Sequence, residues 1–144
     1  SEKIVTAFAS PDTTKTFFHG HSYTANPIAC AAANASIELL LGETCQRQIA
    51  QISANHLDFC QIVRQHRNVK EARCLGTILA VELRTETESS YFNDLRKKIY
   101  PYFLERNILL RPLGNVIYIL PPYVITEAEL KTIYQTIMDF LDTV

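Results

Sequence analysis

The sequence predicts an α/β fold with two layers, in which two N-terminal helices precede a ββαββα unit. We expect a small, mostly antiparallel sheet with helices packed on one face. Three observations predict this fold. Apolar residues recur at helical spacing in some segments and form short β-branched runs in others. All four glycines fall where an element should end or turn, and no internal repeat interrupts the order of elements.

The first half of the chain predicts two consecutive helices after a short amphipathic stretch and an irregular polar segment. The helix over residues 27–41 begins with Asn26 as N-cap and Pro27 at the first helical position. Gly42 is expected as its C′ residue. The next helix is expected over about 44–64, because apolar residues recur there every three or four positions. The members of that face are Cys45, Ile49, Ile52, His56, Phe59, Cys60 and Val63.

The second half begins with a predicted β-hairpin and a helix. Residues 69–74 and 77–83 are rich in strand-forming side chains and meet at Gly76. A helix is expected over 91–106, with Pro101 kinking or weakening it. Its apolar side is formed by Phe92, Leu95, Ile99 and Phe103.

The last part of the chain predicts two more strands and a final helix. Residues 108–112 and 116–120 are expected to pair through a tight turn at 113–115. The final helix should begin at Thr126, which forms a capping box with Glu129. Its buried face consists of Leu130, Ile133, Ile137, Phe140 and Leu141.

The composition of the 144 residues is that of a globular protein, with 47% hydrophobic and 20% charged residues. A formal net charge of -1 gives no electrostatic footprint for nucleic acid or an anionic membrane. The longest apolar run is far shorter than the roughly 20 residues that span a bilayer. The first residues lack the features of a signal peptide. We therefore expect a soluble, cytoplasmic protein that binds neither nucleic acid nor membrane.

The cysteines and histidines do not predict a metal site. No pair of cysteines forms a CxxC motif, and His19 and His21 lack a third ligand at a usual spacing. We expect reduced cysteines in the core. The four cysteines are Cys30, Cys45, Cys60 and Cys74.

The polar loop over residues 19–26 is a candidate anion site. It places two imidazoles, three hydroxyls and backbone N–H groups just before a helix N-terminus. Such a terminus has unsatisfied donors and a partial positive charge, so it attracts phosphate or carboxylate. A surface loop whose polar groups are simply hydrated explains the same residues. The loop by itself leaves both interpretations open.

Arg111 and Tyr118 form a second candidate site, on the two strands expected to pair across the tight turn. An arginine held at a strand end can present its planar fork to a carboxylate. The alternative for Arg111 is an arginine that points into water. The alternative for Tyr118 is a core aromatic with a satisfied hydroxyl.

No catalytic residue is predicted in this chain. Neither a glycine-rich phosphate loop nor a Ser-His-Asp or HExxH pattern occurs. All lysines stand in polar, loop or helix-surface contexts, whereas covalent carbonyl chemistry needs a desolvated amine of low pKa. The six lysines are Lys3, Lys15, Lys70, Lys97, Lys98 and Lys131.

Two long motifs, FFHGHSYTANPIACAAANASIELL and RPLGNVIYILPPYVITEAEL, resemble the C-terminal part of class III, fold-type I pyridoxal-phosphate aminotransferases. The resemblance covers essentially all 144 residues and is strongest to the biotin-biosynthesis branch. It implies that residues 1–26 belong to the large cofactor domain, including the loop 19–26, and that 27–144 form the C-terminal small domain. It also implies a homodimer whose sites are shared across subunits. The implied substrates are S-adenosylmethionine as amino donor and 8-amino-7-oxononanoate, which becomes 7,8-diaminononanoate.

The resemblance implies roles for five residues. Ser22 matches the hydroxyl residue that binds the cofactor phosphate in the neighbouring subunit's site. His21 and Gly20 match the adjoining backbone, which lines the phosphate and the substrate pocket. Arg111 matches the arginine that holds the carboxylate of the acceptor. Tyr118 matches a tyrosine near the adenosylmethionine donor, and arginine is frequent at its position in related aminotransferases for ornithine or 4-aminobutyrate.

Some features depart from the family pattern. Family members commonly have threonine at Ser22 and glycine at Ala25, and alanine is less tolerant of positive φ than glycine is. The Schiff-base lysine, by resemblance, lies upstream of residue 1, so we expect the chain alone to be inactive. Two alternatives remain: another class III omega-aminotransferase, or a non-catalytic ligand-binding or dimerisation module.

Overall fold

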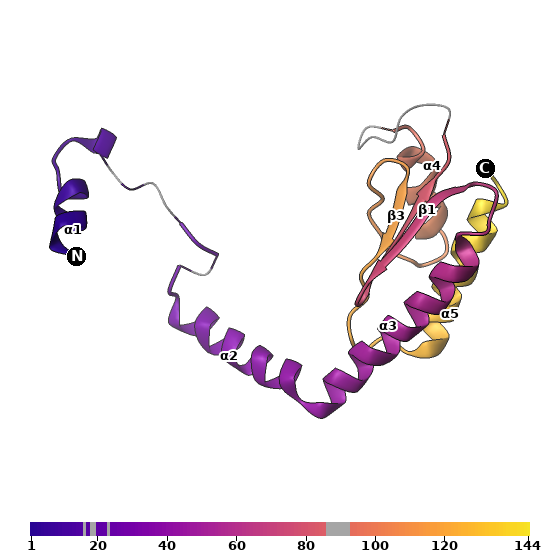
Figure 1. Ribbon diagram of the computed structural model, residues 1–144, viewed down its shortest axis with the longest axis horizontal. Coiled ribbons are helices and arrows are strands. Elements are labelled where there is room, and N and C mark those ends of the chain that lie inside the picture. Colours follow the sequence, from indigo (N-terminus) through magenta and orange to yellow (C-terminus); the bar gives the residue numbers. More distant parts are fainter. Residues whose placement is uncertain (16, 18–19, 23, 86–92) are drawn as a thin grey trace. The chain divides into compact units, whose positions relative to one another are not determined.

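The computed structural model describes residues 1–15, 17, 20–22, 24–85 and 93–144. These residues form two compact units, Ser1–Leu39 and Leu40–Val144. The first unit contains helix α1 (Glu2–Phe8), a short 3-10 turn at Thr13–Lys15 and most of helix α2 (Pro27–Leu41) (Figure 1). The predicted division between a large and a small domain at residue 26 is not tested by these units and stays a prediction.

Helix α2 begins and ends at the residues that the sequence predicts, but the glycine that follows it has a different role. Asn26 is its N-cap, and Pro27 is its first residue. Gly42 follows the helix, but with φ -66° and ψ 144° it is extended and serves as the N-cap of helix α3 (Glu43–Val63). The predicted role of Gly42 as a glycine C′ cap is therefore wrong, since its extended backbone is open to any residue.

The second unit consists of three helices and a three-stranded antiparallel sheet in the order β1-β2-β3 (Figure 1). Its elements are α3, β1 (Val69–Leu75), β2 (Ile78–Leu83), α4 (Arg96–Leu104), β3 (Val116–Ile119) and α5 (Glu127–Leu141). The α/β class and the helices on one face of a small antiparallel sheet are thus confirmed.

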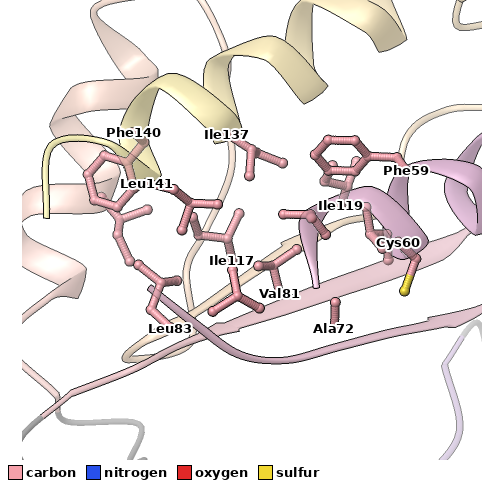
Figure 2. Packing of buried hydrophobic residues seen from close by; sticks show 14 of the residues in the cluster. Phe59, Cys60, Ala72, Val81, Leu83, Ile117, Ile119, Ile137, Phe140 and Leu141 are labelled. Atoms are coloured by element: carbon pink, nitrogen blue, oxygen red, sulfur yellow. The ribbon is translucent and has the colours of Figure 1, made fainter. Parts of the chain in front are cut away.

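The core lies between that face of the sheet and the helices (Figure 2). Alternate residues of the strands point into it, as the period of two requires, and Leu79, Val81 and Leu83 of β2 are at most 1% exposed. The predicted faces of α3 and α5 supply the other side through Phe59, Val63, Ile137, Phe140 and Leu141, all buried. Each fully buried side chain of this size contributes roughly 1.5–3 kcal/mol.

The predicted strand over residues 108–112 is wrong, so the sheet has three strands instead of four. In the described part of the chain only an isolated bridge, Leu113 to Val116, stands beside β3 there. Pro112 has no N–H to give to a ladder, and the Ile108 N–H donates to the Phe103 carbonyl at the end of α4 (2.9 Å). The tight turn does form, with Gly114 at φ +62°. Arg111 therefore lies on a connecting segment.

Two further predictions can be compared with the structure. Helix α4 begins at Arg96 and runs through Pro101, with Ile99 and Phe103 buried as predicted. The expected start at residue 91 lies outside the described residues, as does Phe92. The placement of all four cysteines in the core is wrong: only Cys60 is buried, Cys45 and Cys74 are half-buried, and Cys30 is exposed.

No single helix of the described residues is long and apolar enough to cross a membrane. Helices α2 and α3, which are separated by a bend, reach the necessary length and apolar composition only when they are counted together.

Candidate functional site

The loop that precedes α2 exposes three of the predicted site residues. Gly20, His21 and Ser22 are all exposed. Within the described residues the Ser22 hydroxyl makes no hydrogen bond, so it can donate one to a ligand. The hydroxyl of Thr24 is engaged, because it donates to the His21 carbonyl (2.6 Å). His19, the remaining imidazole of this loop, lies outside the described residues.

The first backbone N–H groups of α2 are already occupied. Asn26 Oδ1 accepts from the N–H of Ile28 (3.0 Å) and of Ala29 (3.2 Å), and the Asn26 carbonyl accepts from Cys30 (2.9 Å). Pro27 has no N–H. The prediction of unsatisfied donors at this terminus is therefore wrong, since the cap that starts the helix consumes them. An anion here would be held by the Ser22 hydroxyl and the positive end of the helix dipole.

The backbone between this hydroxyl and the helix is left-handed at two successive residues that are not glycine. Thr24 has φ +41° and Ala25 has φ +54°. Such values cost an L-residue roughly 1–2 kcal/mol. Ala25 is the position at which the resemblance leads one to expect glycine, so the structure places strain where the sequence departs from that pattern.

The second candidate site lies wholly within the unit Leu40–Val144. A cavity of about 750 Å³ is lined by Arg111 and Tyr118, so the structure brings these two residues together although they are not on paired strands. Arg111 is exposed and Tyr118 is half-buried. Much of the remaining wall is apolar; it includes Ile108, Leu110, Ile119, Pro121, Ile125 and Ile133. A cation beside an apolar wall suits a molecule with a carboxylate and an aliphatic chain.

A second cavity of about 1040 Å³ shares the segment 109–111 with the first. It is lined by the first turn of α4, including Arg96 and Lys97, and by Tyr100. Lys97 is paired with Asp94 (2.7 Å).

Sequence reasoning missed Arg106, which lines the same cavity as Arg111 and Tyr118. Its guanidinium Cζ lies 3.5 Å from the centroid of the Tyr102 ring, and Nη1 donates to the Tyr102 carbonyl (2.9 Å). Tyr102 and Arg106 are four residues apart at the end of a predicted helix, a spacing that brings side chains together. That spacing is the feature of the sequence that could have indicated a contact between Tyr102 and Arg106.

The lysines lie where the sequence places them, because all six are exposed. Three of them form ion pairs with carboxylates: Lys70 with Glu82 (2.7 Å), Lys97 with Asp94 and Lys131 with Glu127 (2.6 Å). In the described residues no three His, Cys, Asp or Glu side chains gather as metal ligands would.

The class-III aminotransferase family model matches residues 1–141. The chain belongs to this family. The match includes both motifs of the sequence, the loop with Ser22 and the segment with Arg111 and Tyr118.

Two curated relatives of this class-III aminotransferase chain share one name. It is 41% identical over 144 residues, all of the chain, to the adenosylmethionine-8-amino-7-oxononanoate aminotransferase of Synechococcus elongatus, and covers 33% of that protein. The Helicobacter pylori protein of that name is 32% identical over 145 residues, which include 97% of the chain and 32% of the relative. The chain thus spans about a third of the length of the relatives it matches.

Solved structures show the same fold. The adenosylmethionine-8-amino-7-oxononanoate aminotransferase of Methanocaldococcus jannaschii superposes with a TM-score of 0.75 at 25% identity, over 100% of this chain and 34% of that one. An omega-transferase from Vibrio fluvialis gives 0.75 at 21% identity, over 99% and 34%. The second likeness shows the fold alone.

Proposed function

We propose that this chain is part of a pyridoxal-phosphate-dependent aminotransferase that transfers the amino group of S-adenosylmethionine to 8-amino-7-oxononanoate. The product is 7,8-diaminononanoate, an intermediate of biotin biosynthesis. The observation that supports this most strongly is the 41% identity over the whole chain to a curated aminotransferase of that name. We further propose that the full-length enzyme is a cytoplasmic homodimer.

The loop before α2 fits the phosphate end of the cofactor. The exposed Ser22 hydroxyl can donate a hydrogen bond to phosphate, and the positive end of the α2 dipole favours a negative charge nearby. His21 and Gly20 line the same loop beside the phosphate and the substrate. When bound, pyridoxal phosphate supplies the carbonyl group that takes up and returns the amino group; the protein supplies binding and orientation.

Arg111 and Tyr118 are proposed to bind the substrates. The Arg111 fork donates two N–H groups to the acceptor's carboxylate, and the apolar wall of the 750 Å³ cavity contacts its aliphatic chain. The half-buried Tyr118 lines the same cavity and would contact the donor.

The catalytic lysine is proposed to lie outside these 144 residues. A lysine that attacks a carbonyl must be neutral at working pH, which requires burial or a neighbouring cation. All six lysines here are exposed, and three are paired with carboxylates. The residues of this chain therefore bind and orient, while proton transfer at the reacting carbon falls to the missing lysine.

Another class-III aminotransferase with a different acceptor is the second candidate. It is compatible with the family match, because members of one fold can act on different substrates. The family match over residues 1–141 favours either transaminase over a non-catalytic binding module.

The test is the activity of the full-length protein and of its Arg111→Lys and Arg111→Ala variants. Loss of a charge-assisted contact costs about 1.5–3 kcal/mol, so we expect kcat/KM for 8-amino-7-oxononanoate to fall roughly ten- to a hundredfold in Arg111→Ala. Arg111→Lys should recover little, since an ammonium cannot reproduce the fork. Cofactor content should stay unchanged. Absence of 7,8-diaminononanoate with the wild-type protein would refute this function, and wild-type rates in both variants would refute the role of Arg111.

A further inference from the structure

Arg106 is held in a fixed position by the aromatic cluster at the end of α4. Its guanidinium stacks on the Tyr102 ring at 3.5 Å and donates to the Tyr102 carbonyl. Tyr102 in turn packs edge-on against the core residues Phe103 and Phe140, with ring centroids 5.8 Å and 5.0 Å apart. A guanidinium fixed in this way loses little conformational entropy when it binds an anion.

The charge of Arg106 is not neutralised by an ion pair with any carboxylate of the described residues. Among the described residues that line the cavity, Glu129 is the one acidic residue, and its Oε2 accepts from the N–H (2.8 Å) and the hydroxyl (2.7 Å) of Thr126. That carboxylate is therefore engaged in the cap of α5. The described residues that line the cavity include two arginines and one glutamate, and their formal charges favour an anion.

We infer that Arg106 is a second carboxylate-recognition residue of this cavity, which draws in aliphatic carboxylates that Arg111 then holds. The apolar wall of the cavity selects for an aliphatic chain, and the fixed guanidinium attracts its carboxylate by charge. The inference rests on the proposed function, since it takes Arg111 as the residue that makes the final contact. Arg106 acts on the approach of the substrate and is a positioning residue.

Such a role predicts that loss of the arginine lowers kcat/KM in a salt-dependent way and leaves kcat unchanged. In the full-length aminotransferase, Arg106→Gln should lower kcat/KM for 8-amino-7-oxononanoate roughly three- to tenfold at low ionic strength, with kcat unchanged. The difference from wild type should shrink at high salt, because exposed charges are screened. Arg106→Lys should recover only part of the loss, since it keeps the charge but not the guanidinium that Tyr102 holds in place.

Arg67→Gln is the matched control. It removes the same charge from another exposed arginine, which lies outside both cavities. Steering by the overall charge of the protein would make the two glutamine variants equal, and this result would overturn the inference. So would a fall in kcat with Arg106→Gln, because it would place the residue in the chemical step.

A binding measurement separates this inference from the proposed function. Titration of the full-length protein with heptanoate should show weaker binding to Arg106→Gln than to wild type or Arg67→Gln, whereas heptylamine should not distinguish them. This pattern in an enzyme inactive on 8-amino-7-oxononanoate would leave the cavity assignment standing and refute the proposed reaction. Equal heptanoate binding by all three proteins would refute the role of Arg106 whatever the enzyme's substrate.

Discussion

A single methyl group distinguishes Ala25 from the glycine that the resemblance leads one to expect at this position, and the backbone there has φ +54°. Ala25→Gly should therefore favour the loop conformation. The gain is about 0.5–1 kcal/mol, because relief of left-handed strain is partly offset by the greater freedom of glycine in the unfolded chain. Amide hydrogen exchange of residues 20–26 should slow several-fold in the variant.

Ala31→Gly is the control for this prediction. Ala31 is an exposed residue inside α2, where glycine costs about 1 kcal/mol relative to alanine. The two substitutions are chemically identical but fall on different backbone conformations, left-handed at Ala25 and helical at Ala31. Their effects on hydrogen exchange should therefore have opposite signs. Faster exchange in both variants would show that the left-handed conformation of Ala25 is not strained.

At the scale of single residues, the sequence predicts what is local and misses what the tertiary structure brings together. Asn26 was identified as an N-cap from its neighbours alone, and the structure confirms it. The same side chain also occupies the first N–H groups of α2, which only the geometry of the cap reveals. The cavity position of Arg106 depends on segments 106–111 and 118–133 meeting, which no local pattern indicates.

At the scale of elements, helices were predicted better than strands. The capping box of α5, from Thr126 to Glu129, forms as expected. The apolar run 108–112 has the composition of a strand, but pairing needs a donor at every second residue and an available edge. Pro112 and the hydrogen bond from Ile108 to Phe103 remove that possibility, and only the register of the whole sheet reveals it.

His56 of α3 is linked to the turn between β1 and β2 and to α5 through a buried hydrogen-bond network. The spacing of apolar residues in the sequence does not reveal this network. The side chain is 0% exposed; Nε2 lies 3.1 Å from the Thr77 carbonyl, and Nδ1 lies 2.5 Å from the Tyr134 hydroxyl. A carbonyl can only accept, so Nε2 is the protonated nitrogen and Nδ1 accepts from Tyr134. Burial lowers the pKa of His56, although the bond to Thr77 opposes this. The pKa of Tyr134 is raised, first by burial and then by the nearby Cys74 and Asp58.

This network predicts that the domain loses stability in mild acid. In the unfolded chain His56 takes up a proton near pH 6.5, whereas in the folded chain its lowered pKa keeps it neutral. The unfolded state then binds more protons, so the free energy of unfolding should fall as pH drops below about 6.5, by at most about 1.4 kcal/mol per pH unit. Urea unfolding at pH 7.5, 6.5 and 5.5 measures this. His56→Gln should be less stable at pH 7.5 but should flatten the dependence; an unchanged slope would assign the acid sensitivity to other groups.

At the scale of the whole molecule, the proposal is that this chain holds the cofactor phosphate and a substrate carboxylate, and that the catalytic lysine lies outside residues 1–144. It spans about a third of its curated relatives, and its six lysines are all exposed. In the full-length protein loaded with pyridoxal phosphate, borohydride reduction should fix the cofactor to one lysine. Peptide mapping by mass spectrometry should find that lysine outside residues 1–144, because a solvated ammonium remains protonated at neutral pH.

Substitution of Lys98 by arginine, which keeps the charge at an exposed site, should leave labelling unchanged. A stoichiometric label on any of the six lysines would mean that this chain contains the catalytic amine and that its exposed surface is buried by the rest of the protein.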